Sequence, residues 1–372
     1  LLLFLPKPIK LASMSKASKT TKNYSDLSVK KLENSQLEIT ASVSTEYFES
    51  FKKKALENIN EEVTIDGFRK GKVPEAILIG KVGEMTILEE MAQLAISSVY
   101  PSLVVEEKIE AIGRPEIQLT KIAAGNPLEF KIITAVVPEV KLGDYKKIAK
   151  ELKTEAPAEV TEKDTEDTLL RIRRSRADHS GHSHENLSQE DHDKLVDAAL
   201  PELTDDFAKS LGDFKDVEDL KAKVKLMLTE EKESKAKDKN RIALSEKLIN
   251  SATMELPEIL VASELRRTES QFEDDMSRMN VKLEDYLKHA KKTIEDLRKD
   301  WRPLAEKKAR LQLILNKIAA DEKIVVSPEE IETEVEHIVK HYTDADRERA
   351  GVYAETVLMN EKVFKMLEGL EK

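Results

Sequence analysis

The stretch Ile65–Pro74, which reads IDGFRKGKVP, is the part of the sequence that decides the local fold. Glycine is scarce in this chain, at 11 of 372 residues, yet Gly67 and Gly71 lie four positions apart here. Glycine tolerates positive φ, and proline suits the first turn of a helix. The stretch therefore predicts a tight loop that leads into a helix near Pro74.

This loop differs in charge from the rest of the chain. Between Gly67 and Pro74 there are three basic residues and no acidic one, whereas the whole chain has a formal net charge of −11. We expect the loop to hold Phe68, Arg69 and Lys70 away from the domain, where they would suit a polyanionic partner with an apolar notch. An ordinary surface turn, with Phe68 folded back into the core, is the alternative.

The wording of residues 67–74, GFRKGKVP, resembles the ribosome-docking signature of the trigger factor family, bacterial chaperones that meet nascent chains at the tunnel exit. Residues 137–145 (VPEVKLGDY) and 200–209 (LPELTDDFAK) also resemble this family, at the end of its first domain and the start of its C-terminal domain. The resemblance implies docking to a protein and rRNA of the large ribosomal subunit through Gly67, Phe68, Arg69, Lys70, Gly71, Lys72 and Pro74.

Composition narrows the class of protein. Charged residues make up 36% of the chain and aromatic residues 5%, which suits long solvated helices more than a compact enzyme core. The acidic net charge argues against nucleic-acid binding by the whole surface, so any such contact must be local. The absence of cysteine excludes disulfides and thiolate catalysis and is compatible with a reducing cytosol. No stretch approaches 18 consecutive apolar residues, so we expect a cytoplasmic protein with no membrane partner.

The first five residues, LLLFL, resemble the core of a signal peptide, but no basic segment precedes them and Pro6 ends the run. We interpret residues 1–13 as an upstream or cloning addition and Met14 as the natural start. A genuine export signal is the alternative, and it would make the protein a periplasmic-type chaperone.

The chain is predicted to contain an α+β ribosome-binding domain and a mainly α-helical, elongated chaperone domain. The alternation over Leu37–Val43 predicts a strand, and we expect the polar residues 14–32 to be disordered up to it. An amphipathic helix over 47–59, two more helices and two strands complete the first domain. The predicted segments are an N-terminal extension over 1–24, the α+β domain over 25–140, a linker, helix and His-rich junction over 141–198, and the helical domain over 199–372.

Helix-start signals recur in the second half. Thr161 and Asp164 predict a capping box, and the run Ser327–Glu330 predicts another helix start with proline at its first position. The resemblance implies that the helical domain holds unfolded nascent polypeptides. Methionine suits such contacts, because its side chain is flexible and polarisable. The candidate client-contact residues are Met254, Leu256, Ile259 and Leu260. For each of them, packing in the core of the helical domain is the alternative.

Trigger factors usually carry an FKBP-like prolyl isomerase domain, and this sequence lacks room for one. Between Asp164 and Leu200 there is one glycine and no aromatic residue, whereas that half-barrel needs several glycines and an aromatic-lined pocket. Clustered histidines in this junction can bind Zn²⁺, but their spacing matches no structural zinc motif: His179, His182, His184 and His192. His337 and His341 lie i,i+4 and could in principle chelate a metal, although a solvated helix face is the simpler interpretation.

The sequence thus predicts an ATP-independent chaperone with no catalytic residues, metal or cofactor, and with self-association possible when the protein is off the ribosome. Its enzyme status stays open, because an isomerase with an unrecognised site is one alternative. A plain helical scaffold is another, but it leaves residues 67–74 unexplained.

Overall fold

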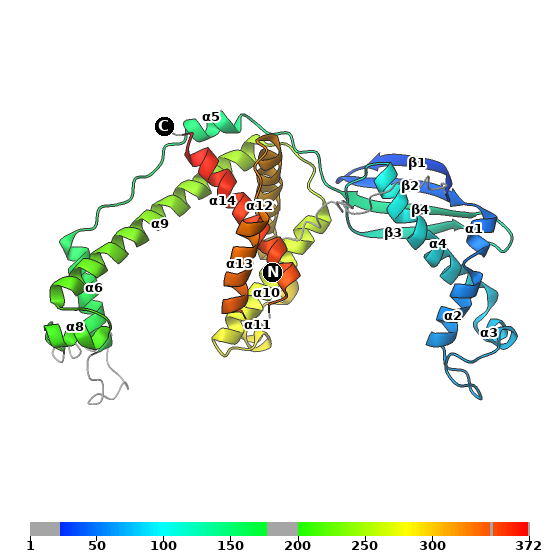
Figure 1. The fold of residues 1–372 in the computed structure, drawn as a ribbon, viewed down its shortest axis with the longest axis horizontal. Helices are drawn as coiled ribbons and strands as arrows, with labels where there is room; N and C mark the ends of the chain where they lie inside the picture. Colours follow the sequence, from blue (N-terminus) through cyan, green and yellow to red (C-terminus); the bar gives the residue numbers. More distant parts are fainter. Residues whose placement is uncertain (1–22, 177–199, 343–344, 371–372) are drawn as a thin grey trace. The chain divides into compact units, whose positions relative to one another are not determined.

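The computed structural model of the chain describes residues 23–176, 200–342 and 345–370 (Figure 1). Contacts divide the chain into two units: residues 1–143 with 249–366, and residues 144–248 with 367–372. The predictions made for residues 1–22 and for the histidines at 179–192 lie outside the described residues. The domain boundaries predicted at residues 140 and 198 stay predictions.

The first unit contains a four-stranded antiparallel sheet in the order β1-β2-β4-β3. The strands are β1 Ser25–Leu32, β2 Gln36–Val43, β3 Ala111–Lys121 and β4 Leu128–Val136. Ile39 of β2 lies opposite Ile132 of β4, and Ala41 lies opposite Phe130. All four side chains are buried, so one face of the sheet forms the core.

Strand β1 corrects one prediction. Residues 14–32 were expected to be disordered, which is wrong for residues 25–32, because they pair with β2. β1 lies at the edge of the sheet and most of its residues are exposed. Leu27 and Val29 alternate with polar residues, but Lys30 and Lys31 end this pattern after two apolar positions, which is too short to predict a strand.

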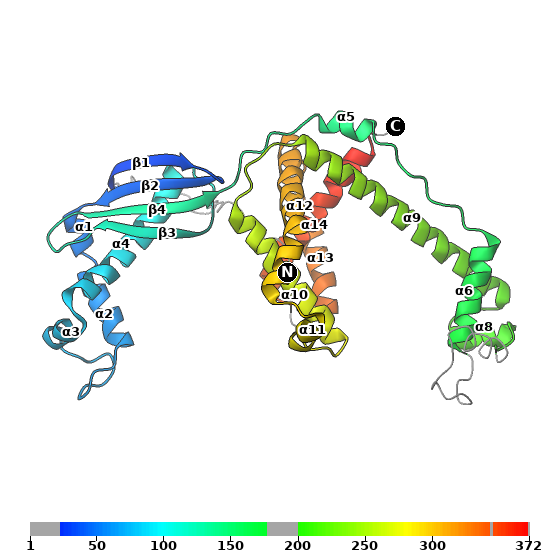
Figure 2. The same cartoon turned by 180° about the vertical axis from the view of Figure 1, so that it is seen from behind.

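Four helices accompany the sheet: α1 Thr45–Glu49, α2 Lys52–Glu62, α3 Glu75–Val82 and α4 Glu84–Glu106. The single helix predicted over 47–59 is therefore divided into α1 and α2. Helix α4 covers one face of the sheet and buries Met91, Ala95 and Val99 against it. Helices α2 and α3 extend away from the sheet, and the loop between them lies at their far end (Figures 1 and 2).

The helical part of the first unit consists of α10 Glu258–Arg278, α11 Leu283–Ala290, α12 Ile294–Asp321, α13 Pro328–His341 and α14 Arg347–Glu368. The last two residues of α14 belong to the second unit. The helix start predicted at Ser327–Glu330 is confirmed: α13 begins at Pro328 and has a capping box. Helix α12 begins with a capping box at Thr293. Helix α10 packs along α12. The side-chain amides of Gln312 and Asn360 exchange hydrogen bonds of 2.9 and 3.1 Å, which join α12 to α14.

The second unit contains α5 Tyr145–Lys150, α6 Glu162–Ser175, α8 Asp205–Leu211 and most of α9 Val217–Ser251. The capping box predicted at Thr161 and Asp164 is confirmed. Leu169, Ala208 and Leu220 bury a small core between α6, α8 and α9. None of the helices within the described residues is long and apolar enough to span a membrane.

Candidate functional site

The loop between α2 and α3 consists of two successive tight turns. The N–H of Phe68 donates to the carbonyl of Ile65 at 3.1 Å, and the N–H of Lys72 donates to the carbonyl of Arg69 at 2.9 Å. The third residue of each turn is a glycine with positive φ, +86° at Gly67 and +77° at Gly71. A turn in which the third residue has a positive φ and the second does not is a type II turn. Glycine adopts a positive φ without strain, which explains why the sequence needs both glycines.

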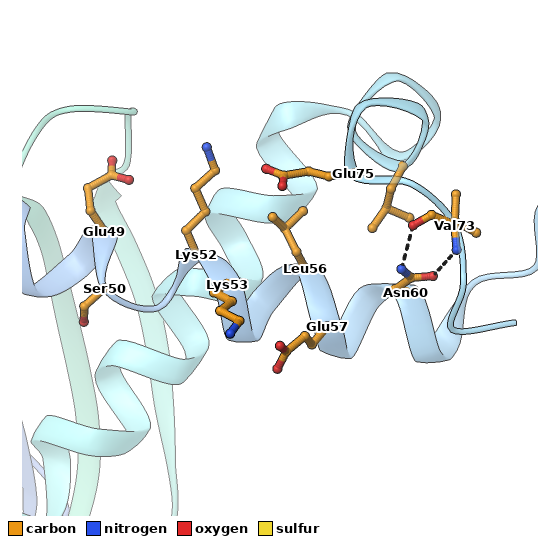
Figure 3. Close-up of a pocket in the computed structure, with 10 residues that line it drawn as sticks. Glu49, Ser50, Lys52, Lys53, Leu56, Glu57, Asn60, Val73 and Glu75 are labelled. Carbon is orange, nitrogen blue, oxygen red and sulfur yellow. Dashed lines mark hydrogen bonds between the residues drawn. The ribbon is translucent and has the colours of Figure 1, made fainter.

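Asn60, near the end of α2, holds the base of this loop (Figure 3). Its side-chain amide donates to the carbonyl of Val73 at 2.8 Å, and its side-chain oxygen accepts from the N–H of Val73 at 3.1 Å. The backbone carbonyl of Asn60 also accepts from the N–H of Gly71 at 3.0 Å. These bonds close the loop over 13 residues. Because the partners lie so far apart along the chain, no local sequence signal marks Asn60 as important.

The closed loop presents its central side chains to solvent. Phe68 is 36% exposed and is therefore not part of the buried core, while Arg69 and Lys70 are also exposed. Lys72 is exposed beside them, whereas Val73 is buried and anchors the return to α3. Across the described ranges, Arg69, Lys70 and Lys72 make no ion pair, so their charges are available to a partner.

A shallow cleft of about 500 Å³ lies next to the loop, between α2 and the start of α3 (Figure 3). Leu56, Val73 and Leu78 provide its apolar surface. Lys52 and Glu75 are among the charged residues that line it, together with further lysine and glutamate side chains. Apolar surface bordered by charges of both signs suits contact with another macromolecule better than it suits a small-molecule site.

The predicted client-contact stretch has a different environment. Met254 and Leu260 are buried, whereas Leu256 and Ile259 are half-buried. Ile259 lies so close to Gly113 of β3 that a Cβ added there would come within 1.9 Å of its Cδ1 atom. The role predicted for this stretch stays a prediction, and only Leu256 and Ile259 retain partly exposed surface for it.

The rings of His337 and His341 lie 4.6 Å apart on α13, as their i,i+4 spacing predicts. Among the described side chains, no group of three or more metal-ligating residues is placed to hold an ion. The histidine pair therefore has no third described ligand.

Comparison with known proteins identifies the family. The family model described as bacterial trigger factor protein matches residues 25–172, and the model of the trigger factor C-terminus matches residues 216–367. The chain is 27% identical over 412 residues to the trigger factor of Moorella thermoacetica, covering 91% of this chain and 92% of that protein. It is 26% identical over 398 residues to the trigger factor of Carboxydothermus hydrogenoformans, covering 87% and 92%.

The fold is similar to that in a solved structure described as "Promiscuous Substrate Recognition in Folding and Assembly Activities of the Trigger Factor Chaperone". The TM-score is 0.52 at 20% identity, with 93% of this chain and 100% of that chain covered. This likeness concerns the fold alone, and it confirms the predicted combination of an α+β domain with a mainly helical one. Together, the two matched family models and these relatives show that the chain belongs to the bacterial trigger factor family.

Proposed function

We propose that this chain is an ATP-independent, cytoplasmic chaperone that docks at the ribosomal tunnel exit and holds nascent polypeptides. The observation that carries the docking role is the pair of type II turns that exposes Phe68, Arg69 and Lys70. The family membership supports the same role, because the matched N-terminal model contains this loop.

The loop has the chemistry that docking to a ribosome requires. Arg69 and Lys70 offer positive charge to rRNA phosphates or acidic side chains, and each phosphate contact releases counterions. Phe68 would fill an apolar notch of the partner, where a half-exposed aromatic ring contributes strongly once it is buried. Asn60 holds the loop in shape before binding, so little conformational entropy is lost on docking.

The helical domain would hold unfolded segments through weak and rapidly exchanging apolar contacts. Leu256 and Ile259 are the candidates retained from the sequence, because Met254 and Leu260 are buried. The family models and relatives support the chaperone function over the periplasmic and isomerase alternatives.

Ribosome co-sedimentation of the full chain tests the docking role. Replacing Phe68, Arg69 and Lys70 by alanine should weaken binding to 70S ribosomes at least about tenfold, because the aromatic and cationic anchors are lost together. The turns themselves should persist, since they depend on the glycines and on Asn60.

Val29→Ala/Lys30→Ala/Lys31→Ala on β1 is a matched control. It also removes one exposed apolar side chain and two exposed lysines from the same domain. Normal binding by this control together with loss in the loop variant is the predicted result. Equal binding by the wild type and the loop variant would contradict the docking assignment.

A further inference from the structure

The step from Asp66 to Gly67, at the start of the loop between α2 and α3, is the only place in the chain where glycine follows an aspartate or an asparagine. At such a step the nitrogen of the glycine can attack the carboxyl carbon of the preceding side chain, because glycine has no side chain to obstruct the approach. Asp66 is exposed, and a Cβ added at Gly67 would meet no atom within 4 Å. The space around the two reacting atoms is therefore open.

The nitrogen that would attack has no competing hydrogen bond. Among the described residues, the N–H of Gly67 donates to no acceptor, and the carboxylate of Asp66 forms neither a hydrogen bond nor an ion pair. Asn34 is also followed by a small residue, but the N–H of Ser35 donates to Oε2 of Glu255 at 3.4 Å. Aspartates inside helices are followed by N–H groups that are bonded within the helix. Asp66 thus differs from these residues in the freedom of the next N–H.

The turn Ile65–Phe68 allows the movement that ring closure needs. Type I and type II turns share the bond between their first and fourth residues, and they differ in the central peptide, with ψ of the second residue about −30° or about +120°. The bond from Phe68 N–H to the Ile65 carbonyl suits both types, and glycine accepts the φ that each requires. In one direction of the rotation between them, the nitrogen of Gly67 passes in front of the carboxyl carbon of Asp66.

The contacts that fix the rest of the loop do not restrain this peptide. The bonds from Asn60 hold Gly71 and Val73, which lie in the second half of the loop. Asp66 itself lines a second cleft, of about 390 Å³, which is open to solvent. Water, the only co-reactant that the reaction needs, therefore reaches the site.

We propose that Asp66 is a site of spontaneous isoaspartate formation in the free protein, and that this modification weakens docking to the ribosome. The nitrogen of Gly67 forms a bond to Cγ of Asp66, and a hydroxyl of the carboxyl group leaves with the amide hydrogen as water, which gives a five-membered succinimide. A water molecule then opens this ring. Addition at Cγ restores aspartate, whereas addition at the backbone carbonyl carbon gives isoaspartate, whose main chain runs through Cβ and Cγ.

The product keeps its charge but has a longer backbone. One extra methylene carbon enters the main chain, which lengthens it by about 1.5 Å. A turn closed by the bond from Phe68 to Ile65 cannot keep its shape with this extra atom, so Phe68 and Arg69 are displaced. Weaker docking would then reflect the position of these side chains and not a loss of charge. This part of the inference rests on the proposed docking function.

Incubation of the full-length protein at neutral pH and physiological temperature for several weeks tests the modification. Peptide mapping by mass spectrometry should find more isoaspartate at position 66 than at any other aspartate. Asp66→Glu should give none at this position, because the six-membered ring that glutamate would form closes far more slowly. Asp167→Glu is the matched control, since Asp167 is exposed but is followed by Thr168 inside α6.

Ribosome co-sedimentation measures the consequence. Freshly prepared wild type and both variants should bind 70S ribosomes equally, and circular dichroism verifies that all three are folded. After incubation, the modified fraction of the wild type and of Asp167→Glu should bind about fivefold more weakly or worse, because anchor side chains are misplaced. Asp66→Glu should bind as it did before incubation.

Enzymatic repair provides a readout that general damage would not give. A protein isoaspartyl methyltransferase transfers a methyl group from S-adenosylmethionine to the new α-carboxylate. Attack by the nitrogen of Gly67 on this ester releases methanol and forms the succinimide again, which returns to aspartate over repeated cycles. Treatment of the incubated wild type should remove isoaspartate at position 66 and restore ribosome binding. Absence of isoaspartate at this position, or undiminished binding by the modified fraction, would overturn the proposal.

The two readouts distinguish this inference from the proposed function. If fresh wild type binds ribosomes but no isoaspartate forms at Asp66, the modification site is wrong and the docking function stands. If isoaspartate forms but fresh wild type does not bind ribosomes, the docking function is contradicted, and the proposed effect on docking is contradicted with it.

Discussion

The α2–loop–α3 region and the helices α10–α14 are both rich in charge, but they use it differently. In the helices, Arg298 pairs with Glu269 at 2.8 Å, and Lys362 pairs with Glu330 at 2.7 Å. The bond from Lys362 lowers the pKa of Glu330 to about 2. Between residues 52 and 82, by contrast, no charged side chain forms an ion pair with any other described residue.

This contrast is not mainly a matter of stability. Exposed ion pairs typically contribute at most about 1 kcal/mol, so leaving charges unpaired costs the first domain little. The two regions differ in whether their cations are available to a partner molecule, because an internally paired cation must first break its ion pair. The loop cations Arg69, Lys70 and Lys72 are ready to bind, and their position is fixed by backbone hydrogen bonds instead of ion pairs.

Two asparagines, Asn60 and Asn240, each hold a distant backbone segment by two hydrogen bonds. Replacing them should give the largest difference between the loop and a helical region. Asn60 bonds twice to buried Val73, and Asn240 of α9 makes the same pair of bonds to exposed Glu155, at 2.8 and 3.0 Å. Asn60→Ala should lower the local opening free energy of the loop by about 2 to 3 kcal/mol, because buried backbone groups lose their partners. Asn240→Ala should cost about 0.5 to 1 kcal/mol, because water can replace it.

Native-state hydrogen exchange over the two segments measures these local free energies. Asn60→Ala should also weaken ribosome binding, although it removes no charge. If the loop exchanges no faster in Asn60→Ala than in the wild type, the bonds from Asn60 to Val73 do not hold the loop in place.

Backbone conformation provides a smaller effect. A Cβ added at Gly67 would meet no atom within 4 Å, so Gly67→Ala tests only the positive φ. It should destabilise the loop by about 1 to 2 kcal/mol. Gly80→Ala is the control, since Gly80 lies inside α3 with equally open space and without positive φ. That change should be neutral or stabilise α3 by up to about 1 kcal/mol. Hydrogen exchange over residues 60–82 compares them, and equal effects of the two changes would exclude turn strain as the reason for Gly67.

Glu264 is the exception to good pairing in the helices. One of its carboxylate oxygens, Oε2, is buried without a hydrogen-bond partner in the part of the chain that the structure describes. We expect Glu264→Met to stabilise the α10–α12 region at pH 7 by about 1 kcal/mol, because a desolvated charge is removed. Arg267, which pairs with Glu264 at 3.5 Å and is 30% exposed, can then turn to solvent.

The pH dependence has a definite sign. Burial raises the pKa of Glu264 in the folded state above its ordinary value of 4.5, so the folded protein binds this proton more tightly than the unfolded chain does. The contribution of Glu264 to the free energy of unfolding therefore falls as pH rises from about 4.5 through the raised pKa. Urea unfolding followed by Trp301 fluorescence should show a smaller gain from Glu264→Met at pH 4 than at pH 7. A gain that is independent of pH would exclude desolvation as its cause.

Several features of the molecule were predictable from local sequence. The glycines at 67 and 71 predict the tight loop, and Ser327 with Glu330 predicts a helix start, because each signal lies within a few residues of its effect. The family followed from three short stretches spread along the chain. The buried face of β2 followed from its alternation of apolar and polar residues.

Other features depend on partners far away in the sequence. β1 is a strand because β2 provides an edge for it, and the apolar alternation of its own residues is limited to Leu27 and Val29. Asn60 matters because Val73 returns to it, and Ile259 is half-buried because Gly113 of β3 lies against it. Local patterns do not contain these long-range contacts.

The most direct test of the docking loop is the salt dependence of ribosome binding. Affinity is measured by co-sedimentation over a range of salt concentrations for the wild type, the Phe68/Arg69/Lys70 alanine variant and the Val29/Lys30/Lys31 control. If the two loop cations meet phosphates, the slope of log affinity against log salt should fall by about 2 in the loop variant and stay unchanged in the control. The same slope in all three proteins would contradict the proposal that the unpaired cations of this loop are the docking contact.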